Sequence, residues 1–243
     1  MPGYDLGIFL RKLEARGPLS DEGRRAVLSL PYTRRTVPPA SYLVREGEAP
    51  RTCSVLLAGH AVRHKILGDG GRQIVSLHIP GDGLDLQSCC LNSADHNVQT
   101  LTRAELAIIP MAVLRQLIWE RPEVSRAILM DVLVESSISR EWITNVGRRD
   151  ARTRLAHLLC EFAWRMDEQQ LKGADEYELP MTQEQLGDAL GMTSVHVNRS
   201  IKALEMDGLI IRNKRTISFP NIAELRSVGD FSALYLHADQ RRH

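Results

Sequence analysis

Short apolar segments separated by glycine and proline fill the first half of the chain. From about residue 32 to residue 110, segments of five to seven residues alternate in part between apolar and polar positions, and turns such as Gly68-Asp69-Gly70-Gly71 separate them. Alternation places side chains on opposite faces of a strand, and glycine-rich turns join antiparallel neighbours. The pattern predicts a β-sandwich or barrel of roughly eight strands.

The pattern becomes helical after Pro110. Pro122 fits the first turn of a new helix, where its missing N–H leaves no intrahelical bond unmade. Beyond it, residues recur at spacings of 3 and 4, which is the a/d pattern of a coiled coil. This stripe predicts a dimerisation helix over residues 122–147, with the interface residues Leu129, Val132, Ser136, Ser139, Ile143 and Val146.

A second interpretation of this helix is that one face packs on the β-domain, and Ile128, Leu133 and Trp142 on other faces are available for that role. The segment Gly147-Arg148-Arg149-Asp150 interrupts the pattern and marks a domain boundary. A further helical unit follows from residue 151, and a charged loop, KGADEYE, occupies residues 172–178. The further helix is expected to bury Leu155, Leu158, Leu159, Phe162 and Met166.

Residues 181–211, MTQEQLGDALGMTSVHVNRSIKALEMDGLII, carry the most specific local signals. Thr182 and Gln185 have the spacing of a capping box, so a helix of about 8 residues is predicted to start there. Gly191 supplies a turn, and Thr193 caps a second helix of about 13 residues. Two such helices around a three-residue turn are typical of a helix-turn-helix.

The second of these helices has two distinct faces. Val197, Ile201 and Leu204 recur at spacings of 4 and 3 and are predicted to be buried. The other face is predicted to enter the major groove of DNA, where the N-terminal residues of a recognition helix meet the base edges. The DNA-binding candidates on this helix are Thr193, Ser194, Val195, His196, Asn198, Arg199 and Lys202.

The segment LIIRNKRTISF, residues 209–219, predicts a β-hairpin with a basic tip, the wing of a winged helix. The tip is expected to contain Arg212, Asn213, Lys214 and Arg215, and of these Lys214 and Arg215 join the DNA-binding candidates, because phosphate contacts need cations. A helix pair with surface Arg and Lys also occurs in all-α domains. The wing and the dimerisation helix together favour DNA binding over that alternative.

Composition limits the other possibilities. The 243 residues allow two domains, and the net charge of +1 leaves room only for a local basic face. The four cysteines show neither a CxxC pair nor metal-ligand spacing, which is typical of reduced cytosolic thiols. The N-terminus lacks the apolar core of a signal peptide, and no apolar run approaches the roughly 20 residues that span a membrane. A cytoplasmic protein without a membrane partner is expected.

The chain contains, in order, a predicted β-roll with IVSLHIPGDGLDL, a long helix, the helix-turn-helix sequence and a basic wing. In this order of elements it resembles the Crp/Fnr superfamily of bacterial transcription regulators over about residues 30–220. The resemblance implies an α+β chain with a cyclic-nucleotide-binding-like effector β-roll at 1–121, the dimerisation helix at 122–147 and a winged helix-turn-helix domain at 148–243. It also implies a homodimer that binds a palindromic promoter site in double-stranded DNA and contacts RNA polymerase, without enzymatic activity.

Two cofactors of this superfamily do not suit the sequence. Cyclic-AMP-binding members have a Gly-Glu pair after the GD turn and an Arg-Ser pair further on, whereas Asp85-Leu86 and the arginine-free SADHNVQT stand here. The segment length instead resembles the oxygen-sensing, fumarate-nitrate branch, whose iron–sulfur cluster needs several N-terminal cysteines. The first 52 residues contain none, so neither cyclic AMP nor a cluster is expected. No cofactor and no metal site is predicted.

Two other effector mechanisms depend on single residues: a redox-responsive thiol and a bound haem. Cys89 and Cys90 lie where the effector site would be and are candidate redox-responsive thiols, although neither has a basic neighbour in sequence. Buried free cysteines are the alternative. Haem would need a ligand, and single histidines on strands are usually structural; the histidines available are His60, His64, His78 and His96.

The recognition helix also departs from the family pattern. Many members have a glutamate at the position of Val195 and an arginine four residues on, which Arg199 matches. Arg199 is therefore the candidate for guanine recognition. Val195 cannot accept a hydrogen bond, so the usual base preference is lost or is replaced by apolar contact with a thymine methyl. Ser194, His196 and Asn198 are expected to contribute to an altered operator.

Two other classes of function stay open. A small-ligand or redox sensor could have an output other than DNA binding, although Asp85-Leu86 and the missing arginine disfavour cyclic nucleotides. An enzyme would need a catalytic constellation, and the chain shows no Ser/His/Asp order, phosphate loop or HExxH motif.

Overall fold

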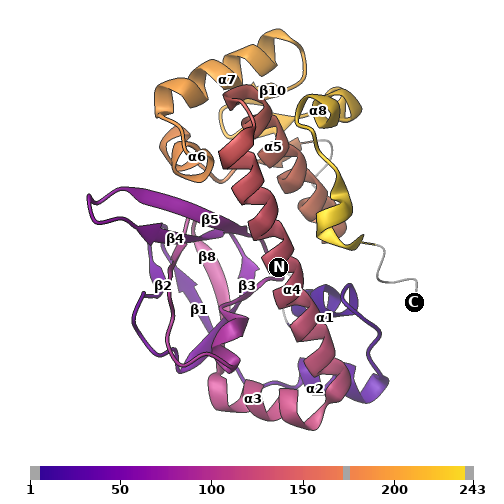
Figure 1. Ribbon diagram of the computed structural model, residues 1–243. Coiled ribbons are helices and arrows are strands. Elements are labelled where there is room, and N and C mark those ends of the chain that lie inside the picture. Colours follow the sequence, from indigo (N-terminus) through magenta and orange to yellow (C-terminus); the bar gives the residue numbers. More distant parts are fainter. Residues whose placement is uncertain (1–5, 172–175, 239–243) are drawn as a thin grey trace. The chain divides into compact units, whose positions relative to one another are not determined.

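The computed structural model describes residues 6–171 and 176–238, whose path is shown in Figure 1. The described residues form two compact units. The first takes its residues from 1–65, 76–137 and 237–243, and the second from 66–75 and 138–236. The long helix α4 (Pro122–Arg148) contributes to both units. The division at 121/122 and 147/148 therefore stays a prediction.

Eight short strands form the β-roll, which confirms the predicted β-domain. They lie in two four-stranded sheets with the orders β1-β8-β3-β6 and β2-β7-β4-β5. The first sheet contains β1 (Thr33–Val37), β8 (Ala104–Pro110), β3 (Thr52–Ala58) and β6 (Gly83–Leu84). The second contains β2 (Tyr42–Val44), β7 (Asn97–Thr100), β4 (Ala61–Ile66) and β5 (Arg72–His78).

Apolar residues at alternate strand positions form the core of the roll. Leu56 of β3 and Leu106 of β8 come from one sheet, and Val98 of β7 comes from the other; all three are fully buried and belong to one cluster. Side chains from two sheets that interlock in this way stabilise a sandwich. The alternation that predicted the strands is the same feature that fills this core.

Two N-terminal helices were not predicted: α1 (Gly7–Glu14) and α2 (Asp21–Leu28). Helix α1 buries Phe9 and Leu13 together with the cation Lys12, and a second cation, Arg16, is buried just after the helix. Lys12 Nζ lies 2.7 Å from Asp82 Oδ1, and Arg16 Nε lies 2.9 Å from Asp131 Oδ1. Buried charges are retained when they are paired. The partners of these cations are far away along the chain. The sequence of the segment is therefore typical of an exposed segment, although both cations are buried.

The helices after the roll begin where the sequence predicted. Helix α3 (Met111–Glu120) follows β8 directly, and Pro122 opens α4. Helix α4 ends at Arg148 and Asp150 caps the next helix, so the helix is interrupted within the predicted segment 147–150. A short 3-10 helix, η1 (Leu86–Cys89), connects β6 to the segment before β7.

Four helices and a small sheet make up most of the second unit. Helix α5 (Ala151–Glu168) buries the five apolar residues that the sequence indicated. The loop expected at 172–178 is partly wrong: Glu176–Glu178 form β9, while residues 172–175 lie outside the described residues. The remaining elements are α6 (Gln183–Leu190), α7 (Ser194–Met206), β10 (Ile211–Asn213), β11 (Thr216–Ser218), α8 (Ile222–Val228) and η2 (Ala233–Leu236).

Buried polar contacts fix α5 within this unit. Glu161 accepts hydrogen bonds from Trp142 Nε1 at 3.0 Å and from Tyr235 Oη at 2.9 Å. His157 Nδ1 lies 2.9 Å from the carbonyl oxygen of Gly229. These hydrogen bonds offset the desolvation of Glu161 and His157.

Candidate nucleic-acid interface

The first helix of the pair, α6, has the capping geometry that its sequence predicted. The Thr182 hydroxyl accepts from the Gln185 backbone N–H at 3.2 Å, and Gln185 Oε1 accepts from the Thr182 backbone N–H at 2.9 Å. Gly191 ends the helix with φ +61°, a left-handed conformation that favours glycine. Local residue chemistry therefore sets both ends of α6.

The turn between α6 and α7 is tight because of a second glycine. A Cβ on Gly187 would lie 2.5 Å from the carbonyl oxygen of Met192, so a larger residue there would push the turn away from α6. Thr193 then caps α7, its hydroxyl accepting from the His196 backbone N–H at 3.3 Å. The close approach holds the N-terminus of α7 at a fixed place relative to α6.

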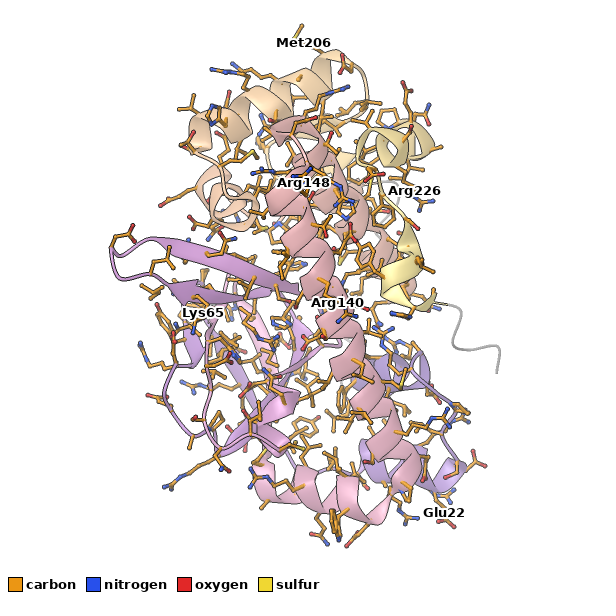
Figure 2. All side chains as sticks on the ribbon, in the orientation of Figure 1. Glu22, Lys65, Arg140, Arg148, Met206 and Arg226 are labelled. Carbon is orange, nitrogen blue, oxygen red and sulfur yellow. The ribbon has the colours of Figure 1, made fainter. Side chains whose placement is uncertain are left out.

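The two faces of α7 divide as expected. Val197, Ile201 and Leu204 are buried, together with Leu186 and Leu190 of α6. Met206 near the C-terminal end of the helix is 88% exposed and projects into solvent (Figure 2). On the opposite face, the exposed DNA-binding candidates are Thr193, Ser194, Val195, His196, Arg199 and Lys202.

Asn198 differs from the other candidates. It is half-buried, and its Nδ2 donates to Gln183 Oε1 of α6 at 3.2 Å. The amide thus connects the two helices rather than standing free on the exposed face. Sequence spacing placed Asn198 on the right side of α7 but could not show this contact. Its role in an operator stays a prediction.

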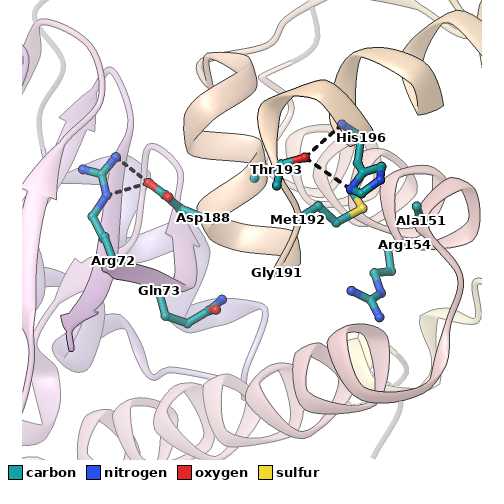
Figure 3. Close-up of a pocket in the computed structure, with 10 residues that line it drawn as sticks. Arg72, Gln73, Ala151, Arg154, Asp188, Gly191, Met192, Thr193 and His196 are labelled. Atoms are coloured by element: carbon teal, nitrogen blue, oxygen red, sulfur yellow. Dashed lines mark hydrogen bonds and ion pairs between the residues drawn. The ribbon is translucent and has the colours of Figure 1, made fainter. Parts of the chain in front are cut away.

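His196 lies at the edge of a cleft of about 530 Å³ beside the N-terminal end of α7 (Figure 3). Its Nδ1 is 3.2 Å from the Thr193 hydroxyl. When that hydroxyl donates to Nδ1, the neutral ring carries its proton on Nε2, which is then a donor. Across the cleft, Asp188 Oδ2 pairs with Arg72 Nη2 at 2.7 Å, so this carboxylate is neutralised.

The wing is a hairpin of β10 and β11 with a shorter tip than expected. Arg212 and Asn213 lie in β10, and only Lys214 and Arg215 form the tip. Lys214 has φ +56°, which the two-residue connection requires. Arg212 Nε lies 3.3 Å from Glu205 Oε1 of α7, so one of the expected tip cations instead ties the wing to the helix.

Helix α4 exposes the stripe that the heptad pattern indicated. Leu129 is 57% exposed and Ile143 is 73% exposed, which is unusual for large apolar side chains. Of the residues that the alternative interpretation offers for packing on the β-domain, Ile128 and Trp142 are buried, whereas Leu133 is 51% exposed. The other stripe residues are Val132, Ser136, Ser139 and Val146, each exposed or half-buried. Their role in a dimer stays a prediction.

The two candidate redox cysteines differ in their surroundings. Cys90 is exposed, whereas Cys89 is half-buried with its Sγ 3.5 Å from Met111 Sδ. Burial raises the pKa of the Cys89 thiol to about 11, so the thiol keeps its proton at neutral pH. Arg115, which the sequence did not associate with these residues, donates to the backbone carbonyl oxygens of Ser88 and Cys89. A redox role stays a prediction.

Asp85 is buried and precedes Leu86, which stands where a cyclic-nucleotide site has its glutamate. Its carboxylate accepts from the Ser88 hydroxyl, and its Oδ1 lies 3.3 Å from His96 Nε2. His96 Nδ1 also pairs with Asp95 at 2.7 Å, and this hydrogen bond lowers the pKa of Asp95. Three of the four histidines weighed as haem ligands are buried: His64, His78 and His96.

Within residues 6–171 and 176–238, no group of three or more His, Cys, Asp or Glu side chains is arranged to hold a metal ion. In the same part of the chain, no helix has the length and apolar composition to cross a membrane.

The fold and this surface define a class of protein, in which a β-roll of the cyclic-nucleotide-binding type is joined to a winged helix-turn-helix domain. Residues 34–121 match the family model of the cyclic nucleotide-binding domain, and residues 153–228 match that of the Crp-like helix-turn-helix domain. The chain belongs to the Crp/Fnr family of transcription regulators.

Known relatives agree with this assignment. A probable transcriptional activator of Rhizobium leguminosarum is 29% identical over 210 residues, which is 86% of each chain. The transcriptional activator protein FnrL of Cereibacter sphaeroides is 29% identical over 182 residues, 73% of each chain. The structure of FixK2 from Bradyrhizobium japonicum superposes with a TM-score of 0.75 at 24% identity, covering 84% of this chain and all of that one. The first two relatives are named as transcriptional activators, and the proteins to which the chain is similar are regulators rather than enzymes.

Proposed function

We propose that the chain regulates transcription as a homodimer that binds a palindromic promoter site. The observation that carries the proposal is the exposed face of α7, where Arg199 and Lys202 stand on a helix whose N-terminus is fixed by Thr193. A recognition helix of this kind enters the major groove, where arginine donates to guanine O6 and N7. Lys214 and Arg215 on the wing are suited to contact phosphates.

The exposed stripe on α4 supports the homodimer. Leu129, Leu133 and Ile143 are apolar side chains that a second copy of α4 would cover. Two-fold symmetry in the protein requires a two-fold symmetric site, with half-sites about one helical turn of DNA apart. Contact with RNA polymerase is included in the proposal because the relatives are named as activators. A cytoplasmic location follows from the need to reach chromosomal DNA.

The effector is proposed to be neither a cyclic nucleotide nor an iron–sulfur cluster. Leu86, which stands where a cyclic-nucleotide site has its glutamate, offers no carboxylate to a ribose hydroxyl, and the neighbouring Asp85 accepts from the Ser88 hydroxyl. Cys53 and Cys160 are buried, and burial raises the pKa of Cys160 to about 12. Calorimetric titration with cyclic AMP and cyclic GMP should show no heat of binding, and binding at micromolar concentration would contradict this part of the proposal.

The experiment that tests the function is selection of bound DNA from a random library by the purified protein, under reducing and oxidising conditions. The expected product is an inverted repeat that binds two chains, as measured by the mass of the complex in solution. A selected motif without symmetry would contradict the dimer. Enrichment of no motif would contradict sequence-specific DNA binding, and different yields in the two conditions would identify a redox response.

A further inference from the structure

Val195 is an exposed apolar residue on the face of α7 that carries the DNA-binding candidates. It is 66% exposed, whereas Val197 two residues further on is fully buried in the core. Its neighbours Ser194 and His196 are exposed and polar. A branched apolar side chain at this place contributes little to packing of the domain. Because polar groups surround it, it is not part of an extended apolar patch of the kind that binds another protein.

The chemistry of the major groove offers one kind of partner for such a side chain. Base edges there present hydrogen-bond donors and acceptors, and the C5-methyl group of thymine is the apolar exception. We propose that Val195 packs against a thymine methyl group in each operator half-site and so determines the base at that position. This inference rests on the proposed function. Of the two alternatives for Val195, lost base preference and contact with a thymine methyl group, it selects the second.

The geometry of α7 places this thymine relative to the base that Arg199 contacts. Val195 and Arg199 are separated by one turn of the helix, so their side chains share a face. Four residues correspond to about 6 Å along the helix axis, and base pairs are spaced by about 3.4 Å. The thymine is therefore expected within about two base pairs of the guanine recognised by Arg199. The exposed cations Arg199 and Lys202 complement the charge of the DNA around it.

The test uses the full-length protein and the operator obtained by selection. Each thymine of one half-site is replaced in turn by deoxyuridine, which removes only the methyl group, and affinity is measured by fluorescence anisotropy. One replacement should weaken binding by about fourfold, the factor that corresponds to one buried methyl-sized group. With Val195→Ala, the thymine and deoxyuridine operators should bind equally, because the partner of the methyl group has been removed.

Matched controls separate this contact from general effects. Leu234 in η2 is 82% exposed, and Leu234→Ala should preserve the full deoxyuridine effect. Thermal unfolding checks that Val195→Ala folds like the parent protein, and Val195→Thr supplies a second variant of similar shape with one methyl group replaced by hydroxyl.

The outcomes are distinguishable. If no thymine shows a loss, or if Val195→Ala retains the same loss, the thymine contact is wrong while sequence-specific DNA binding stands. If selection yields no operator at all, the proposed function fails and the thymine contact fails with it.

Discussion

Charged residues serve opposite purposes in the two units. In the first unit, Lys12 and Arg16 are buried and are paired with Asp131 at 3.7 Å and 2.9 Å. In the second unit, Arg199 and Lys202 stand exposed on α7. The first pair of cations is taken out of water and must be neutralised by the fold, whereas the second pair remains hydrated and available to a partner.

This difference shows that the number of cations does not identify a binding surface. The net charge of +1 is small, and the N-terminal helices are as rich in cations as the helix-turn-helix. What distinguishes the second unit is that its cations lie on a helix face opposite a complete apolar face. Substitutions that remove charges should therefore affect stability in one unit and DNA binding in the other.

The largest effect on stability is expected from Asp131→Ala. The change leaves Arg16 and Lys12 buried without this carboxylate, and removal of one partner of a buried pair costs about 3–5 kcal/mol. Urea denaturation followed by circular dichroism measures the loss. The matched control is Glu22→Ala, which removes an exposed carboxylate that pairs with Arg121 at 2.8 Å and should cost less than about 1 kcal/mol. Equal losses in the two variants would contradict the comparison.

A change on α4 should affect assembly without affecting the fold of the monomer. Ile143→Asp places a charge on a side chain that is 73% exposed, so the monomer should fold, while a dimer would have to bury the charge at a cost of about 2–5 kcal/mol. Sedimentation equilibrium should show a monomer, with weaker operator binding. Thr144→Asp adds the same charge on a neighbouring exposed face and should remain dimeric. A dimeric Ile143→Asp protein would show that the stripe is not the interface.

Arg199→Ala tests the other unit. Loss of a bidentate contact with guanine should weaken binding to the selected operator by about 5-fold to 150-fold, which corresponds to about 1–3 kcal/mol, and should relax preference at that base. Competition between the operator and a scrambled duplex measures both effects. Because Arg199 is exposed, the free energy of unfolding should not change. Unchanged discrimination between the two duplexes would remove Arg199 from base recognition.

The same contrast explains which features could be predicted from the sequence. Thr182, Gln185, Gly191 and Thr193 act on backbone groups within a few residues, so their effects can be recognised from spacing alone. The apolar face of α7 and the strands of the roll follow from periodicity for the same reason. The family resemblance then joined these pieces in the right order.

Contacts between distant residues could not be predicted in this way. Lys12 pairs with Asp82, which is 70 residues away, so a cation stands on the buried face of α1 beside Phe9 and Leu13 and the sequence alone does not reveal its partner. The amide of Asn198 bonds to Gln183 across the helix pair, and Arg212 pairs with Glu205 instead of standing at the tip of the wing. Leu133, one helical turn after Leu129, is exposed although the alternative interpretation offers it for packing, because the exposed apolar strip of α4 is wider than the a/d positions.

Two buried histidines predict a pH dependence of stability. Burial lowers the pKa of His78 and of His157 from 6.5, so the unfolded chain binds protons more readily than the folded chain. Stability is therefore complete above about pH 6.5 and decreases as the pH falls, with a slope that approaches about 1.4 kcal/mol per pH unit for each histidine. Aspartates with a lowered pKa, such as Asp150, reduce stability only when the pH falls below the ordinary aspartate pKa of 3.8, so they do not contribute to this slope.

Urea denaturation at intervals between pH 7.5 and pH 5 measures this slope. His157→Gln should flatten it by the share of one histidine. Stability that stays constant across this range would show that the two histidines bind protons equally well in the folded and the unfolded protein.

The smallest expected effects come from the wing. Lys214 and Arg215 are proposed to contact phosphates, which are the same in every sequence, so Lys214→Ala and Arg215→Ala should weaken operator and scrambled duplexes alike. Each change should lower the slope of log affinity against log salt concentration by about 1, because one fewer counterion is released. Arg212 is the matched control: its guanidinium is held by Glu205, so Arg212→Ala should change the salt dependence less than either tip variant. A larger effect at Arg212 would place the phosphate contact on β10. It would also contradict the expectation that a cation held in an ion pair contributes less to DNA binding than an exposed cation at the tip.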